Sequence, residues 1–478
     1  MITGARTIIC MRSFGPAALL SLVFVPQVPA QTRAFEPPPN LYTASLHTFS
    51  VLRSGIEIDD LTTGVRHPAS HTQDATLAGT TDHRDLTGGW YNAGDYGKWP
   101  MMAAITVSYL LGLYELQQRT VWSQTQFGHQ PDPLLLEEAR WGLTWMLKMQ
   151  DPDGGVRQKV DGATHASLSA AWGKPPELDP NLRIAAPAST GSTADFTAVM
   201  YQAARFFESK DRNQSRRFRT AADRAWDWLT LHPNVPAHDP FYIDHDPAGE
   251  LLWAQSEHAL AHQQDLPALA QTIAARSQPE VSWIDPSLLG LYSLASSPAS
   301  PPHLREAAHT VILQRANALA ESAAVRPFRV ALGDGDYWWG SAERVLHRAA
   351  FFLMADSLEP SPRLHQAALD QLAWILGNNS VNHSFITAFG TNPVLHPWHW
   401  TYRDYGIVMP GWAVGGPNGS PEGVDPALKA LQQQGTPPAR CYVDLCSSDG
   451  SWASNEGQIS EEAALVFVTG ELRVSSGR

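Results

Sequence analysis

The chain has 478 residues and a formal net charge of −13. Hydrophobic residues make up 43% of it and charged residues 17%, so it can bury a large core and does not have the composition of a disordered protein. An acidic chain without a long run of lysine or arginine is not suited to bind nucleic acid or an anionic membrane surface.

The first thirty residues have the pattern of a secretory signal peptide. Arg12 precedes an apolar stretch at 17–25, and residues 28–30 (VPA) form a small-residue cleavage site. The stretch is too short to span a membrane as a helix. We expect residues 1–30 to be removed and residues 31–478 to form a single domain of a secreted or periplasmic protein, which we take to be a monomer.

Helical periodicity dominates the rest of the chain. Apolar residues recur every three or four positions in twelve segments, near 42–54, 103–119, 134–150, 192–208, 214–231, 249–264, 266–277, 284–296, 303–323, 339–357, 361–377 and 456–470. Strand patterns are nearly absent, which excludes β-sandwiches and α/β folds. Periodicity alone predicts an all-α fold, and twelve helices are the number that an (α/α)₆ barrel of six helical hairpins needs.

Four long segments between these helices are predicted loops, at 76–100, 151–191, 378–424 and 433–455. Loops of this length are uncommon in a compact domain unless they are functional. We expect them to line one mouth of the barrel.

The first loop contains residues 88–98 (GGWYNAGDYGK), which have no hydrophobic periodicity. Glycines allow turns and a close approach of the backbone to a ligand, so Asp95 can point into a cleft. Lys98, three residues on, is expected to help keep Asp95 ionised. The alternative interpretation is a solvated aspartate in an Asx-type turn.

A second distinctive segment is 451–456 (SWASNE), which precedes a mostly apolar run at 463–468. Glu456 lies beside Trp452 and ahead of this run, so it is a candidate acid whose pKa is raised by burial. The alternative is an ordinary first-turn glutamate, which the helix dipole would stabilise as the anion.

Together the two segments resemble glycoside hydrolase family 9, the inverting cellulases. Segments 141–160, 186–198 and 439–444 also look like that family, and the resemblance covers about residues 54–472. It implies an (α/α)₆ barrel in which one catalytic domain cleaves β-1,4-glucosidic bonds of a polysaccharide or oligosaccharide. It also implies that Asp95 is the general base and Glu456 the general acid, and that no cofactor is required. Some family members bind calcium, which leaves a structural calcium site open.

The chain departs from the family pattern at three places. Asn92 stands where the family has the first aspartate of Asp-Ala-Gly-Asp, and losing that charge is expected to lower the pKa of Asp95 and weaken it as a base. The family usually ends the stretch at 384–400 with His-x-Arg, whereas tryptophans flank His399 here. Gln458 and Glu462 replace a small residue and an asparagine.

Aromatic side chains in the loops are candidate sugar platforms, because pyranose rings stack on indole faces. The chain has 17 tryptophans. The candidate substrate-binding residues are Trp90, Tyr91, Trp398, His399, Trp400 and Trp452, and for any one of them the alternative is core packing.

The sequence contains no pattern typical of a metal site. His396 and His399 have no third ligand at a suitable spacing, and residues 151–154 (DPDG) are expected to form a turn because the acidic ligand of a calcium loop is missing downstream. Cys441 and Cys446 lie five positions apart, and in an exported protein they predict a disulfide rather than two free thiols.

Two other functions stay open at this point. One is an exo-acting glycosidase on cello- or chito-oligosaccharides, because changed loops alter which end of a cleft is open. The other is a catalytically weakened glucan-binding protein on the same fold, favoured by Asn92, Trp398 and Trp400. The retention of both Asp95 and Glu456 favours an enzyme.

Overall fold

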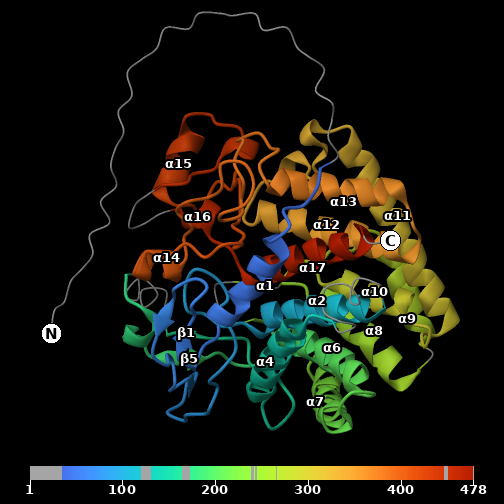
Figure 1. The fold of residues 1–478 in the computed structure, drawn as a ribbon. Helices are drawn as coiled ribbons and strands as arrows, with labels where there is room; N and C mark the ends of the chain where they lie inside the picture. The colour runs from blue at the N-terminus through green and yellow to red at the C-terminus, as the bar shows by residue number, and fades with distance from the viewer. Residues whose placement is uncertain are drawn as a thin grey trace, which may run out of the picture.

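The computed structural model describes residues 35–119, 131–163, 173–237, 242, 245–264, 266–445 and 451–476. The predicted signal peptide at 1–30 lies outside the described residues. Within them, twelve long helices alternate along the chain between an outer and an inner ring (Figure 1). None of these helices is long and apolar enough to cross a membrane.

The inner ring closes on itself, since each inner helix packs against the next and the last packs against the first. Its members are α2 (Pro100–Arg119), α6 (Thr190–Phe207), α8 (Ala248–His262), α10 (Ser287–Ser296), α12 (Ser341–Leu358) and α17 (Ile459–Ser476). The outer helices are α1 (Leu41–Val51), α4 (Pro133–Met149), α7 (Arg212–Leu231), α9 (Pro267–Ala275), α11 (Pro302–Ala324) and α13 (Pro362–Ile375). This arrangement is an (α/α)₆ barrel, and all twelve helices lie where periodicity predicts them.

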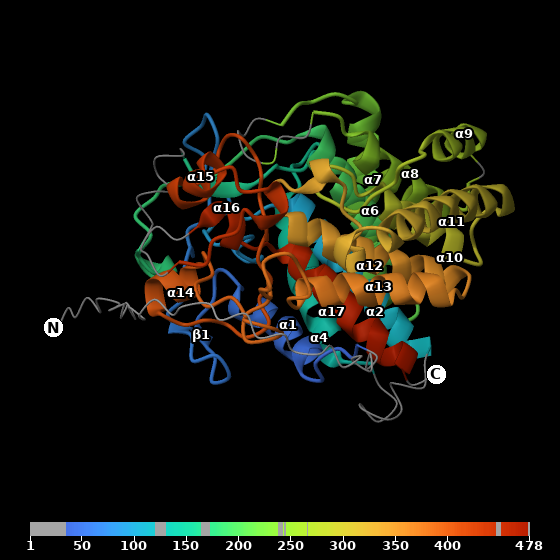
Figure 2. The ribbon, with the colours of Figure 1, turned by 90° about the horizontal axis from the view of Figure 1, so that it is seen from above.

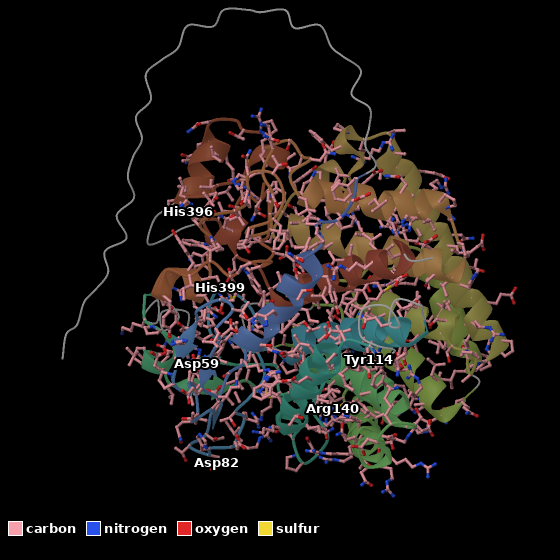
Figure 3. The ribbon with its side chains drawn as sticks, viewed as in Figure 1. Asp59, Asp82, Tyr114, Arg140, His396 and His399 are labelled. Carbon is pink, nitrogen blue, oxygen red and sulfur yellow. The ribbon has the colours of Figure 1, made fainter. Side chains whose placement is uncertain are left out.

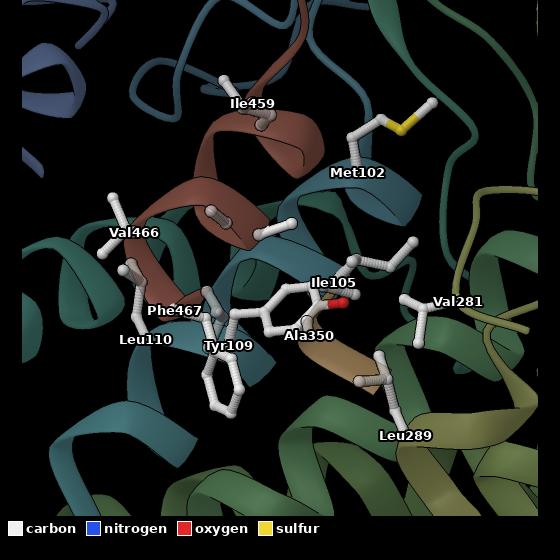
Figure 4. Packing of buried hydrophobic residues seen from close by; sticks show 14 of the residues in the cluster. Met102, Ile105, Tyr109, Leu110, Val281, Leu289, Ala350, Ile459, Val466 and Phe467 are labelled. Atoms are coloured by element: carbon white, nitrogen blue, oxygen red, sulfur yellow. The ribbon is translucent and has the colours of Figure 1, made fainter. Parts of the chain in front are cut away.

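Burial explains which helices are inside. Nearly every residue of α6 is buried, and many are alanine, glycine, serine or threonine, which let neighbouring helices approach closely. Helix α7 instead buries a single stripe that recurs every three or four residues, the pattern of a helix with one face in solvent. Figure 4 shows the inner packing, where Tyr109 of α2 and Phe467 of α17 meet with ring centroids 5.3 Å apart.

Local sequence signals set where several helices begin. Asp132, Ser189, Asp211 and Ser361 each accept a hydrogen bond from a backbone N–H of the first helical turn. Such N-caps satisfy donors that the helix itself leaves free.

Short elements gather at one end of the barrel (Figures 1 and 2). Strands β1 (Ile58–Asp59) and β2 (Arg66–His67) pair antiparallel, and β3 (Thr76–Leu77), β5 (Arg183–Ala185) and β4 (Val160–Gly162) form a small sheet in that order. The short helices there are α14 (Trp400–Tyr405), α15 (Pro426–Gln433) and α16 (Trp452–Asn455), and four 3₁₀ turns lie at Pro176–Leu178, Pro327–Arg329, Asp334–Asp336 and Pro438–Arg440. The prediction of loops over 378–424 and 433–455 is wrong at α14 and α16, which are too short to show a helical period, while α15 lies almost entirely between the two predicted loops.

A buried ion cluster fixes the segment at 88–98. Asp74 Oδ2 lies 2.7 Å from Lys98 Nζ, and Asp74 Oδ1 accepts from Arg183 Nε at 3.0 Å. Lys98 Nζ also donates to the carbonyl oxygens of Leu86 at 3.1 Å and Gly88 at 2.8 Å. The expectation that Lys98 supports the charge of Asp95 is therefore wrong, because the Lys98 ammonium group instead contacts Asp74 and these two carbonyl oxygens.

Replacing Asp74 with alanine is expected to reduce the free energy of unfolding by about 3–5 kcal/mol, because it leaves two buried cations without their shared partner. Chemical denaturation of the purified protein measures this loss. The matched control is Asp85→Ala, which breaks the exposed ion pair with Lys148 at 3.0 Å and should cost less than about 1 kcal/mol. Equal losses in the two variants would contradict the structural role given to the buried cluster.

Candidate active site

A cavity of about 670 Å³ opens where the long loops meet. Both candidate carboxylates line it, together with residues of α12, β4 and the start of α17. The acidic side chains in its wall are Asp95, Asp161, Glu343, Glu456 and Glu461, and the aromatic ones are Trp99, Tyr242, Trp283, Trp338, Trp339, Trp398 and Trp452. A cavity with aromatic walls and several carboxylates is suited to a sugar chain rather than to an anion.

Asp95 lies in the turn that precedes α2. The N–H of Gly97 donates to Asp95 Oδ1 at 3.1 Å, and the N–H of Asn92 donates to the carbonyl oxygen of Gly97 at 2.8 Å, which closes the turn. Burial, and then the charge of Asp161, raise the pKa of Asp95 to about 6. With an amide at position 92 the pKa of Asp95 still lies above its ordinary value, first because the carboxyl group is buried and then because Asp161 supplies a neighbouring negative charge that the sequence pattern did not reveal.

Glu456 lies between α16 and α17, ahead of the helix predicted to begin near 456, so the alternative interpretation of a first-turn glutamate does not hold. The N–H of Gly94 donates to Glu456 Oε1 at 3.1 Å, across 362 positions of the sequence. Burial, and then the charge of Asp95, raise the pKa of Glu456 well above its ordinary value. Since α17 begins only at Ile459, the dipole of that helix does not outweigh these two effects.

Asn92 connects the two carboxylate segments. Its backbone carbonyl oxygen accepts from the N–H of Ile459 at 2.9 Å, and its side-chain Nδ2 donates to the hydroxyl of Tyr242 at 3.2 Å. Its Oδ1 is buried and has no hydrogen-bond partner among the described residues. Asn92 therefore contributes to the cavity wall a buried amide oxygen without a partner among the described residues, and no charge.

Four of the aromatic and imidazole candidates pack in the core instead of facing the cavity. Trp90, Tyr91, His399 and Trp400 are each at most 1% exposed. Trp90 Nε1 donates to Glu138 at 3.1 Å, and His399 accepts from the N–H of Thr401 at 3.2 Å as the N-cap of α14. This corrects the expectation that these four residues bind sugar, since loop position in the sequence does not tell which way a side chain faces.

Two of the predicted platforms do line the cavity. Trp398 and Trp452 lie in its wall, on the segments that lead to α14 and into α16. The guanidinium of Arg403 lies 5.2 Å from the ring centre of Trp398 and donates to the carbonyl oxygen of Gly94 at 3.3 Å. A cation thus reaches the Asp95 loop from α14, although the family's usual arginine position holds Trp400.

Sequence reasoning missed one further group, an acidic cluster at the base of the cavity. Glu343 accepts hydrogen bonds from Gln458 Nε2 and from Ser460 Oγ, the latter at 3.1 Å. Glu461 Oε1 is buried without a hydrogen-bond partner among the described residues, and burial, then the charge of Glu343, raise the pKa of Glu461 well above its ordinary value. The helical period identifies positions 343 and 461 as inward-facing. A carboxylate at an inward-facing position was therefore the sequence signal that could have revealed this cluster.

The groups considered as metal ligands have other partners. His396 and His399, both labelled in Figure 3, precede α14 in the chain; His396 Nδ1 lies 3.0 Å from Asp444 Oδ1, while His399 caps the helix. In the turn at 151–154, Asp151 Oδ1 is held by Arg157 Nε at 2.9 Å. Within the described ranges no cluster of three histidine, cysteine or acidic side chains is arranged to hold a metal ion.

The predicted disulfide stays a prediction. Cys441 is a buried free thiol whose Sγ donates to the carbonyl oxygen of Thr436 at 3.3 Å. Cys446 lies outside the described residues, so the structure does not show the predicted pair.

The family described as "Glycosyl hydrolase family 9" matches residues 39–469, and the chain belongs to this family. Among curated relatives, Endoglucanase C of Cellulomonas fimi is 29% identical over 89% of this chain and 42% of its own length. Endoglucanase D of Acetivibrio thermocellus is 27% identical over 87% of this chain and 66% of its own length. The chain thus spans between two fifths and two thirds of the length of these two relatives.

Solved structures share the fold. The GH family 9 endoglucanase J30 superposes with a TM-score of 0.80 at 28% identity, covering 90% of this chain and 84% of that one. AaCel9A in complex with cellobiose-like isofagomine also gives a TM-score of 0.80, at 30% identity over 91% of this chain and 84% of that one. The predicted (α/α)₆ barrel and the predicted family are confirmed.

Gly94 is predicted to tolerate no side chain. A Cβ there would overlap the carbonyl oxygen and the ring of Trp398, so Gly94→Ala should push the Asp95 loop away from the segment that carries Trp398. We expect a loss of about 2 kcal/mol in the free energy of unfolding. The control is Gly335→Ala, an exposed glycine with open space around its Cβ position, which should change it by less than about 0.5 kcal/mol. Similar values for both variants would show that the loop relaxes freely.

Proposed function

We propose that the chain is a secreted glycoside hydrolase that cleaves β-1,4-glucosidic bonds of cellulose or a related β-glucan by inversion. The observation that carries the proposal is the pairing of Asp95 and Glu456 in one aromatic-walled cavity, where burial raises the pKa of both. Inverting hydrolysis needs one ionised and one protonated carboxyl group on opposite faces of the sugar ring. The names of the relatives agree with this substrate class.

In the proposed mechanism Asp95 accepts a proton from a water molecule. The water oxygen forms a bond to the anomeric carbon while the glycosidic carbon–oxygen bond breaks, and Glu456 gives its proton to the departing sugar oxygen. Asn92 Oδ1 is proposed to accept the second hydrogen of that water. Trp398 and Trp452 are proposed to stack on sugar rings, and no step requires a cofactor.

An exo-acting mode stays open beside the endo mode. One relative that is 26% identical over 81% of this chain is named Cellulose 1,4-beta-cellobiosidase. Analysis of the products from soluble cellulose derivatives and from cello- and chito-oligosaccharides separates the two modes. If the protein binds cello-oligosaccharides without cleaving any of these substrates, the glucan-binding alternative replaces the hydrolase.

Glu456→Gln is expected to reduce turnover of native β-glucan by about 10²–10⁴-fold, because glutamine cannot donate the proton that a sugar alkoxide needs. A β-cellobioside with an activated aryl leaving group should lose far less, since its departure needs little protonation. Initial rates on both substrates measure the difference. Unchanged hydrolysis of native glucan would refute the acid assignment.

Asp95→Asn should instead reduce the rates on both substrates together, because the attacking water needs its base whatever group departs. In the wild type, Asp95 acts only when ionised, so kcat/KM should fall as the pH drops through about 6. Glu456 acts only when protonated, so kcat/KM should fall again at a pH above its raised pKa. A pH–rate profile on a soluble glucan measures both limbs, and activity that stays constant well below pH 6 would contradict Asp95 as the base.

A further inference from the structure

Strand β4 brings another carboxylate, Asp161, into the cavity beside Asp95. We propose that Asp161 is a positioning residue of the water-activating site, which supplies next to Asp95 the negative charge that the amide of Asn92 lacks. The inference rests on the proposed function, because it concerns the base of the same reaction.

The backbone determines the place of Asp161. The N–H groups of Lys98 and Val160 each donate to the other's carbonyl oxygen at 2.9 Å, and this antiparallel bridge sets Asp161 beside Gly97. A Cβ built on Gly97 would lie 3.4 Å from Asp161 Cγ, while the N–H of the same glycine donates to Asp95 Oδ1 at 3.1 Å. The two carboxylates therefore lie on either side of one glycine, close enough for their charges to repel each other.

The Asp161 side chain is held firmly in this position. It is 2% exposed, its Oδ2 accepts from Lys159 Nζ at 3.1 Å and its Oδ1 accepts from the N–H of Gly162 at 2.7 Å. Arg183 Nη1 lies 3.6 Å from Oδ1. Two cationic partners and a backbone donor thus hold the carboxylate in one orientation.

Two side chains thus provide the two properties that one carboxylate of the Asp-Ala-Gly-Asp pattern would combine, a hydrogen-bond acceptor and a negative charge. Asn92 keeps a hydrogen-bond acceptor at the cavity wall, because its Oδ1 has no partner among the described residues while its Nδ2 is directed to Tyr242. Asp161 provides the charge from a different strand. With Asp161 in this position, the amide at position 92 does not prevent Asp95 from acting as the base.

The charged groups that face Asp95 come from three sides. Asp161 and Lys159 lie on or beside β4, Arg403 comes from α14, and Glu456 lies ahead of α17. Burial and the charge of Asp161 raise the pKa of Asp95, whereas Arg403 and Lys159 lower it. Removing the charge of Asp161 leaves the two cations in place, so the pKa of Asp95 must fall.

The test compares Asp161→Asn with Lys159→Met, which removes the other member of the same ion pair. In Asp161→Asn the acidic limb of kcat/KM on an aryl β-cellobioside should move to lower pH by about one unit. The plateau should drop about tenfold, because a weaker base removes a proton less readily. In Lys159→Met the limb should move to higher pH. If the pair served stability alone, both variants would lose stability and neither limb would move, which would overturn the inference.

A charge exchange sharpens the test. The double variant Asn92→Asp/Asp161→Asn moves the carboxylate from β4 to its usual place in the loop, so its acidic limb should return toward that of the wild type. A limb that stays at the position of Asp161→Asn would contradict the claim that the missing charge is what matters.

A measurement without substrate separates this inference from the proposed function. The ionisation of Asp95 can be followed by infrared spectroscopy, as the carboxylate band that wild type shows and Asp95→Asn lacks. Its midpoint should fall in Asp161→Asn even if the protein cleaves no glucan. An unchanged midpoint in the folded variant would overturn the inference while leaving the glucanase proposal untouched.

Discussion

The packing of α17 against α2 is the contact on which the site depends. The two helices are the last and the first of the inner ring, and their contact closes the barrel. Asp95 lies just before α2 and Glu456 just before α17, so closing the ring brings the two carboxylates to the same end of the molecule. The hydrogen bond from the N–H of Ile459 to the carbonyl oxygen of Asn92 and that from the N–H of Gly94 to Glu456 then align the two segments.

The loop that holds Asp95 packs Trp90, Tyr91 and Tyr96 into the core, and buried charges hold its backbone in place. Asp74 joins Lys98 and Arg183, and Arg183 also donates to the carbonyl oxygen of Tyr96 at 2.7 Å. A buried ion cluster is a costly way to gain stability, because each charge must be desolvated. Here the ion cluster determines geometry, because it fixes an irregular segment whose backbone is not held by the hydrogen bonds of a helix or a sheet.

The electrostatics of the cavity follow from burial and like charge. Both candidate carboxyl groups have raised pKa values, first from burial and then from a neighbouring charge, that of Asp161 for Asp95 and that of Asp95 for Glu456. The loop has an amide at position 92, and the second acidic side chain near Asp95, Asp161, comes from a different segment of the chain. The motif along the chain therefore does not by itself describe the acidic groups around Asp95.

The sequence by itself determined the helices, and its resemblance to the family implied the barrel and the two candidate carboxylates. Helical period and capping residues are local properties, and the residues of 88–98 and 451–456 make Asp95 and Glu456 candidates without reference to a structure. Only the tertiary structure decided which side chains reach the cavity. It placed Trp90 and Trp400 in the core and Trp398 and Trp452 in the wall, because the direction of a loop side chain depends on what packs behind it. It also brought Asp161 to Asp95 through a bridge between Lys98 and Val160, a pairing of distant residues that no local pattern encodes.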